Sequence, residues 1–193
     1  MKPVVFLDRD GTLIEEVNFL LKEGQIKVFP DAIEALRLLR EAGFLLIVVS
    51  NQSGVARGFL SEERVEELNR VVFSQMRMLG CVPDAFYFCP AHPRAEDEKY
   101  RRNLHCRKPE TGMAEQAALR FEIDFTHSYA VGDKLADVGL GQNLGGKGAL
   151  VLTGHGRQEY DSLSDDSEYQ PDFIADNILT AARWIISDHS SVK

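Results

Sequence analysis

Two pairs of carboxylates stand where apolar, strand-like runs end. Asp8 and Asp10 follow the run Val4–Leu7, and Asp133 and Asp137 follow a later run of the same kind. Carboxylates brought close together repel one another unless a cation lies among them. Mg²⁺ is a hard cation that prefers oxygen ligands. If the chain brings the two pairs together, it therefore gains a divalent-cation site suited to phosphate chemistry.

The first pair also has the spacing of a nucleophile and a proton carrier. Asp8 could attack a phosphorus atom. Asp10 could protonate the leaving oxygen and later deprotonate the attacking water. Gly11 lets the backbone leave the strand sharply. Taken alone, Asp and Gly at a strand end are also typical of an ordinary turn, and the later pair of an acidic helix N-terminus.

Two further motifs offer groups that can hold a phosphate. Ser50, Asn51 and Gln52 follow a second apolar run and supply a hydroxyl and two amides. Lys108 could hold a phosphoryl group as a point charge, and Arg107 has the planar fork that binds anions bidentately. Each motif alone is typical of a polar loop or a solvated basic pair. Together with the carboxylates they predict one convergent site.

Strand-like runs alternate with helical patterns along the chain, which predicts right-handed crossovers in an α/β fold. We expect a doubly wound, Rossmann-like, mostly parallel sheet with helices on both faces. Ligands of such sheets bind outside the carboxyl ends of the strands. The expected strands span 4–7, 44–49, 85–88, 127–131 and 149–152, with an edge at 173–174. The expected helices are one opened by Asp31 with Glu34 in a capping box, one capped by Ser61, and others over 110–120, 134–144 and 178–186.

The length and composition favour one soluble domain over 1–193. The chain has 193 residues, 44% of them hydrophobic, and a formal net charge of −8. An acidic balance argues against nucleic acid as a partner, and the apolar runs are too short for a signal peptide or a membrane span. We expect a cytoplasmic monomer with no membrane partner. Segment 15–28 is a candidate flap over the site, and 89–109 a candidate substrate or zinc loop.

The four motifs, in this order, resemble those of the haloacid dehalogenase superfamily of phosphohydrolases. More narrowly, they are similar to its branch of heptose bisphosphate and histidinol phosphatases, which has no large cap domain. The resemblance implies an Mg²⁺-dependent phosphate monoester hydrolase, and D-glycero-D-manno-heptose 1,7-bisphosphate 7-phosphatase activity in carbohydrate and lipopolysaccharide biosynthesis. The motifs are FLDRDGT at 6–12, SNQSG at 50–54, CRKP at 106–109 and VGDK at 131–134.

The resemblance also implies roles for individual residues. Asp8 is the expected nucleophile and Asp10 the general acid/base, and Asp8, the Asp10 carbonyl and Asp133 would hold Mg²⁺ with Asp137 in support. Ser50 and Lys108 would stabilise the transferring phosphoryl group. The expected contacts with a small phosphorylated sugar are Glu16, Val17, Asn18, Phe19, Asn51, Gln52, Ser53, Arg107 and Lys134.

Members of this branch commonly hold a structural zinc in the loop before the Arg-Lys-Pro motif. Two of the four matching positions here are Ala91 and Leu104, which cannot ligate a metal. Neighbouring side chains offer a displaced set with the ligand types that zinc prefers. Either this set binds zinc or the loop packs without metal, and structural disulfides are not expected in a reducing compartment. The displaced set is Cys89, His92, His105 and Cys106, while His127, His155 and His189 show no partner pattern.

Three other interpretations stay open. Within enzymes, the substrate could be histidinol phosphate or another sugar phosphate. From a different class, the chain could be a catalytically silent protein that binds a phosphometabolite, although the presence of both Asp8 and Asp10 argues against this. A response-regulator-like domain also carries an acidic site on a parallel sheet, but it would leave Asp10 without a purpose.

Overall fold

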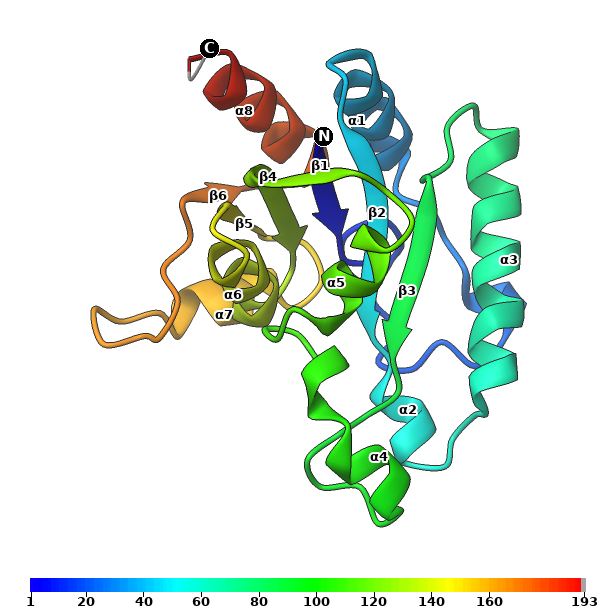
Figure 1. Cartoon of the computed structure of the whole chain (residues 1–193). Helices are drawn as coiled ribbons and strands as arrows, with labels where there is room; N and C mark the ends of the chain where they lie inside the picture. Colours follow the sequence, from blue (N-terminus) through cyan, green and yellow to red (C-terminus); the bar gives the residue numbers. More distant parts are fainter. Residues whose placement is uncertain (192–193) are drawn as a thin grey trace.

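A six-stranded parallel sheet organises the chain (Figure 1). This computed structural model describes residues 1–191. The strands lie in the order β3-β2-β1-β4-β5-β6, and every neighbouring pair is parallel. The predicted α/β class and doubly wound sheet are therefore confirmed. The strands are β1 (Lys2–Leu7), β2 (Leu45–Asn51), β3 (Ala85–Cys89), β4 (Ile123–Gly132), β5 (Lys147–Val151) and β6 (Phe173–Ala175).

Helices cover both faces of this sheet. Buried residues of α1, α3 and α8 pack on one face, and those of α5 and α6 pack on the other. No helix among residues 1–191 is both long enough and apolar enough to span a membrane. The helices are α1 (Pro30–Glu41), α2 (Ser53–Ala56), α3 (Glu62–Met78), α4 (Glu98–Arg102), α5 (Gly112–Ala118), α6 (Leu135–Asn143), α7 (Gly156–Asp161) and α8 (Ile178–Ser191), with 3₁₀ turns η1 (Glu23–Gln25) and η2 (Leu104–Cys106).

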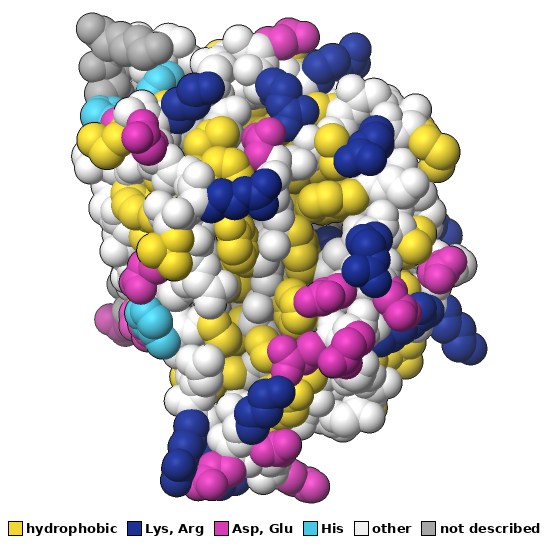
Figure 2. Space-filling model, turned by 45° about the vertical axis from the view of Figure 1, so that its right-hand side comes forward, with side chains coloured by type: hydrophobic (Ala, Val, Ile, Leu, Met, Phe, Trp, Pro, Cys, Tyr) yellow, Lys and Arg dark blue, Asp and Glu magenta, His cyan; other side chains and the backbone are white. Residues whose placement is uncertain are grey.

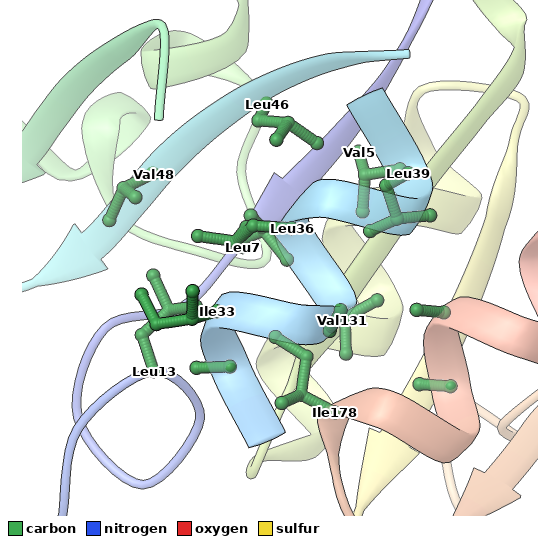
Figure 3. Packing of buried hydrophobic residues seen from close by; sticks show 14 of the residues in the cluster. Val5, Leu7, Leu13, Ile33, Leu36, Leu39, Leu46, Val48, Val131 and Ile178 are labelled. Carbon is green, nitrogen blue, oxygen red and sulfur yellow. The ribbon is translucent and has the colours of Figure 1, made fainter. Parts of the chain in front are cut away.

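Alternate residues of β1 supply the two cores. Val5 and Leu7 pack with the buried side of α1, where Leu36 and Leu39 lie (Figure 3). The residues between them along the strand belong to the second cluster, under α5 and α6. A central strand buried on both faces is apolar at every position. This explains why the first strand is an unbroken apolar run that ends abruptly at Asp8.

The helix starts are partly as predicted. Ser61 caps α3, and its hydroxyl accepts a hydrogen bond from the Arg64 amide at 3.2 Å. The capping box predicted at Asp31 is wrong, because α1 begins one residue earlier, at Pro30, after Phe29 as N-cap. Proline favours the first helical position, since it has no N–H to leave unpaired and its φ is already helical.

The edge strand β3 is only half covered by α3. Phe73 of α3 packs edge-on against Phe86 of β3, with 6.1 Å between the ring centroids. The view turned toward this side of the molecule shows apolar side chains on the surface between charged ones (Figure 2). Further along α3, Asn69 is 5% exposed. This helix therefore places one polar side chain inside the protein.

The sheet reverses its strand order next to β1. Its neighbours are β2 on one side and β4 on the other, with Leu7 in register with both Val48 and Val131. Ligand sites of doubly wound sheets lie at such a reversal, beyond the carboxyl ends of the strands. The polar residues that follow β1, β2 and β4 therefore meet in one place.

Two connecting segments lie beyond these strand ends. The predicted flap 15–28 leaves and rejoins the body through a bridge between Ile14 and Val28, and it carries η1. The segment 89–109, expected to be a long loop, contains α4 and η2. Both segments therefore have more local structure than their mixed sequences indicate.

Candidate active site

Three buried aspartates gather beyond the ends of β1 and β4. Carboxylate oxygens of Asp8, Asp133 and Asp137 all lie within 4.8 Å of one another. These residues are 7%, 0% and 3% exposed, so water cannot screen their charges well. The structure thus brings Asp8 to two residues that lie 125 and 129 positions further along the chain, as the sequence motifs predict.

Asp133 is held in a cradle that has no room for side chains. A Cβ atom on Gly11 would lie 2.2 Å from Asp133 Oδ2, and one on Gly154 would lie 2.3 Å from the same oxygen. Oδ2 accepts a hydrogen bond from the backbone amide of His155 at 2.8 Å. The other oxygen, Oδ1, is buried and has no hydrogen-bond partner within residues 1–191. A bound cation would give this buried, unpaired carboxylate oxygen a partner.

The acidic groups are hard to ionise together. Burial raises the pKa of Asp8 to about 6, with Lys108 opposing the rise and Asp137 and Asp10 adding to it. Burial also raises the pKa of Asp133 to about 8, with Asp8 and Asp137 contributing. Two carboxylates with such pKa values gain most from a divalent cation between them. The donor set of oxygens therefore fits Mg²⁺.

Lys108 is the one cation that the structure places against Asp8 among residues 1–191. Its Nζ donates to Asp8 Oδ1 and to the Val49 carbonyl, both at 2.6 Å, and lies 2.5 Å from Asp137 Oδ1. Burial alone would lower the pKa of Lys108, but Asp137 and Asp8 outweigh it and hold this pKa above its usual range. The amine is therefore charged where a phosphoryl group would meet Asp8.

Asn51 fixes the backbone of Lys108 rather than only lining the site. Its Oδ1 accepts from the Lys108 amide at 3.0 Å, and its Nδ2 donates to the Lys108 carbonyl at 3.2 Å. The two bonds join the end of β2 to Lys108, two residues beyond η2. The position of the Lys108 amine thus depends on an amide side chain from a different motif.

Asp10 lies beside Asp8 but bonds to another set of groups. Its carboxylate accepts hydrogen bonds from the buried guanidinium of Arg9 and, at 2.9 Å, from Gln52 Nε2. The same Gln52 nitrogen donates to Ser50 Oγ at 2.8 Å. Gln52 therefore links the expected proton carrier to the hydroxyl that would face the phosphoryl group.

Asp8, Asp10 and Asp137 line a cavity of about 230 Å³, whereas the fully buried Asp133 does not reach its surface. The flap 15–28 and the loop after β5 meet in its wall, where Glu16 Oε2 lies 3.7 Å from His155 Nε2. The other Glu16 oxygen accepts a hydrogen bond from the Asn18 amide. Phe19 forms the apolar side. Predicted residues that line the cavity are Asp8, Asp10, Glu16, Asn18, Phe19, Ser50, Asn51, Gln52, Ser53, Lys108, Lys134 and Asp137.

Two predicted contact residues lie elsewhere. Val17 packs against the hydrophobic core and not in the cavity. Arg107 is outside the cavity wall, where its Nη1 donates to the Ala91 carbonyl at 3.1 Å. Burial and the nearby Arg57 lower the pKa of Arg107. Two guanidiniums thus stand together next to the site, and Arg57 also lies 5.8 Å from the ring centre of Phe19.

His155 was missed in the sequence, although a signal for it exists. It lines the cavity from the loop after β5. It follows the end of β5 by four residues, so the rule that ligand-binding residues lie beyond strand ends points to it as well. Arg9 was missed for another reason: it lies between the two motif aspartates, and only the tertiary structure shows where its side chain goes.

The expectation that the chain has no structural disulfide is wrong. Cys89 and Cys106 form a disulfide, with 5.3 Å between their Cα atoms, because segment 89–109 folds back on itself. Cys81 is free and buried. The displaced zinc set is also wrong: His92 Nδ1 accepts from the Arg94 amide at 3.1 Å, and His105 Nε2 bonds to Glu115 at 2.9 Å. The two histidines face other partners and do not join the sulfurs.

Known proteins with this sequence pattern identify the family. A family model described as HAD-hydrolase-like matches residues 105–181. Over 189 residues, the chain is 38% identical to the D-glycero-D-manno-heptose-1,7-bisphosphate 7-phosphatase of Chlorobaculum tepidum. The aligned region covers 95% of this chain and 94% of the relative. The chain belongs to the haloacid dehalogenase-like phosphatases.

Other members resemble this phosphatase over most of its length. The Escherichia coli relative, named D-glycero-beta-D-manno-heptose-1,7-bisphosphate 7-phosphatase, is 38% identical over 154 residues, or 79% of this chain and 80% of its own. The crystal structure of D,D-heptose 1,7-bisphosphate phosphatase from B. bronchiseptica, complexed with magnesium and phosphate, has a TM-score of 0.80 at 26% identity. That comparison covers 97% of this chain and 99% of the other.

The buried acids make the metal-free phosphatase less stable as pH rises. The unfolded chain releases both protons near pH 4, whereas folded Asp8 keeps its proton to about pH 6 and folded Asp133 to about pH 8, so the free energy of unfolding falls with pH across this range. We expect urea unfolding in EDTA to show a loss of at least about 1 kcal/mol from pH 5 to pH 8. Asp133→Asn should flatten this slope, whereas exposed Asp161→Asn should keep it. A pH-independent free energy for the unsubstituted protein would contradict the burial argument.

The cradle of Asp133 predicts a specific effect of one methyl group. Gly11→Ala should raise the Mg²⁺ concentration for half-maximal binding at least about tenfold, because the new Cβ displaces the carboxylate. Gly43→Ala is the matched control: its φ is also positive, at +97° against +77° for Gly11, but its Cβ meets nothing within 4 Å. Both variants should lose about 1 kcal/mol of stability through the positive φ, and Gly11→Ala should lose more because its Cβ also clashes with Asp133. Isothermal titration calorimetry separates the two effects, and equal Mg²⁺ affinity in both variants would be the contrary result.

Proposed function

We propose that this phosphatase removes the 7-phosphate of D-glycero-D-manno-heptose 1,7-bisphosphate through an aspartyl-phosphate on Asp8. The observation that carries the reaction is the position of Asp8 at the cavity, 2.6 Å from a buried lysine and beside two further carboxylates. The substrate is supported by the shared name of relatives that match 95% of the chain.

Two displacements at phosphorus make up the reaction. In the first, an Asp8 oxygen bonds to phosphorus, the bond from phosphorus to the sugar oxygen breaks, and Asp10 gives that oxygen a proton. In the second, Asp10 takes a proton from water as the water oxygen bonds to phosphorus. The bond from phosphorus to Asp8 then breaks and inorganic phosphate leaves. Asp10 ends as it began, protonated, and Asp8 is again a free carboxylate.

The surrounding groups stabilise charge that develops on the phosphoryl oxygens. Lys108 provides a fixed ammonium and Ser50 a hydroxyl, and both are buried, so their interactions are little screened. Asp8, the carbonyl of Asp10 and Asp133 would hold Mg²⁺, which when bound offsets the negative charge of phosphate and carboxylates. Asp137 supports the arrangement by pairing with Lys108.

Selection of a sugar bisphosphate needs polar contacts away from the reacting phosphate. Glu16 and Asn18 offer hydrogen-bonding groups to sugar hydroxyls at the cavity wall. Arg107, close to Arg57, supplies positive charge beyond that wall, where the second phosphate would lie. A substrate with a phosphate at each end fits this division of charge better than one with an amine at the far end.

A steady-state screen with Mg²⁺ tests the proposal. The purified protein is assayed against the heptose bisphosphate, histidinol phosphate, other sugar phosphates and p-nitrophenyl phosphate. We expect kcat/KM to be highest for the heptose bisphosphate. Highest efficiency with histidinol phosphate would move the substrate assignment to the amino alcohol. Complete inactivity on all substrates would indicate a silent binding protein.

Replacement of the nucleophile gives the sharpest test of the chemistry. Asp8→Asn should lower kcat by at least about 10⁴-fold while leaving the fold intact, because an amide cannot form the acyl phosphate. Asp161→Asn, on the exposed end of α7, is the matched control and should keep full activity. Mass spectrometry of the quenched wild-type reaction should show a phosphate on Asp8. Substantial turnover by the Asp8 variant would refute its role.

Arg107 should matter for the second phosphate only. Arg107→Ala should raise KM for the heptose bisphosphate about tenfold or more, the worth of one charge-assisted hydrogen bond. KM for a monophosphorylated sugar should change little. Arg102→Ala, an exposed arginine of the same segment that pairs with Glu98, controls for general charge. Equal effects of Arg107→Ala on both substrates would place the second phosphate elsewhere.

A further inference from the structure

The carboxylate of Asp10 is gripped by the arginine that precedes it. Arg9 is 2% exposed. Its Nε donates to Asp10 Oδ1 at 3.1 Å, and its Nη2 donates to Oδ1 at 3.0 Å and to Oδ2 at 2.7 Å. A planar fork with two of its nitrogens on one carboxylate fixes the plane and direction of that carboxylate. The position of the expected proton carrier therefore follows the position of Arg9.

The third nitrogen of Arg9 is held by a residue outside the four sequence motifs. Its Nη1 donates to Asn69 Oδ1 of α3 at 2.7 Å, across 60 positions of sequence. Nη2 also donates to Gln52 Oε1 at 3.1 Å. All three guanidinium nitrogens are thus engaged, and one of their acceptors comes from a helix that supplies no residue to the cavity wall described above.

As a packing residue, Asn69 would destabilise the fold. Its Nδ2 is buried and has no hydrogen-bond partner among residues 1–191. An unpaired buried amide donor destabilises a fold, and the neighbouring inward positions of α3 are apolar. The hydrogen bond that Asn69 does make is the one to Arg9. Its side chain is therefore better explained by what it does to Arg9 than by stability.

We propose that Asn69 is a positioning residue for general acid catalysis: it holds Arg9, and Arg9 fixes the plane and position of the Asp10 carboxyl group. This inference rests on the proposed function, in which Asp10 is the proton carrier. A shift of a catalytic group by a fraction of an ångström is enough to impair proton transfer. Loss of the Asn69 acceptor frees one end of the Arg9 fork and lets Asp10 move.

Such a role has a signature that a structural role lacks. A leaving group that is a weak base needs little help from an acid, whereas an alkoxide needs a proton as it leaves. The parameter kcat/KM reports only the steps up to departure of the leaving group, so it isolates this proton transfer from the later attack of water. Loss of positioning should therefore grow with the basicity of the leaving group.

The experiment compares kcat/KM for p-nitrophenyl phosphate, phenyl phosphate and the heptose bisphosphate, all with Mg²⁺. Asn69→Leu keeps the branched shape and the number of side-chain heavy atoms and removes the acceptor, and Asn69→Ala removes both the acceptor and most of the side chain. Both should lower kcat/KM for the heptose bisphosphate by about 10- to 100-fold. They should lower it less for phenyl phosphate and least for p-nitrophenyl phosphate. Asn69→Asp keeps an acceptor oxygen for Arg9, so its kcat/KM values on the three substrates should be close to those of the wild type.

Controls separate this effect from misfolding. Ser74→Ala, on the exposed side of α3, should match wild type on all three substrates. Melting temperatures show whether each variant is folded, and Asn69→Leu serves if Asn69→Ala is not. A loss of equal size on all three substrates, or no loss, would overturn the role of Asn69 alone. Wild-type inactivity on all three would overturn the proposed function as well.

Discussion

One imbalance of buried charge underlies this molecule. Asp8, Asp133 and Asp137 meet near two lysines: Lys108 contacts Asp8 and Asp137, and the charge of Lys134 opposes the rise in the pKa of Asp133. Removing charged groups from water costs several kcal/mol for each ion after relaxation, and two lysines cannot offset three carboxylates. Protons or a divalent cation must supply the remainder. The raised pKa values and the unpaired Asp133 oxygen are two expressions of this same deficit.

The fold holds these like-charged side chains close together on rigid elements. Parallel strands buried on both faces end together, so residues from β1, β2 and β4 meet without any of them needing a long loop. The hydrophobic clusters on both faces hold the strand ends in place. Around them, backbone amides and neutral amide side chains orient the charged groups. The chemistry is thus assembled by rigid elements, and the flap and segment 89–109 are left to shape the cavity.

Sequence alone could predict the parts that depend on local pattern. The ends of apolar runs located Asp8, Asp10 and Asp133, because a buried strand shows its boundary as a change from apolar to charged residues. The start of α1 could not be placed correctly, since Pro30 and Asp31 are both good candidates and only packing decides. The strand-end rule would have found His155 had it been extended to β5.

Other features depend on tertiary distances that spacing does not encode. Asn69 lies on an amphipathic helix, where a single polar residue looks like part of the solvent face. The displaced zinc set had suitable ligand types, but His92 and His105 turn to other partners and the sulfurs of Cys89 and Cys106 bond to each other. Val17 was placed with its neighbours in a contact loop, yet side chains of one short segment can face opposite ways.

The pair of hydrogen bonds between Asn51 and the Lys108 backbone has an evolutionary consequence. These bonds hold the last residues of segment 89–109 against the sheet, whatever conformation the rest of that segment adopts. Insertions, deletions or substitutions before Lys108 can therefore change the shape of the cavity while the Lys108 ammonium stays against Asp8. The scaffold can therefore diversify its choice of phosphate ester by grafting one segment, with the bond-breaking apparatus inherited unchanged.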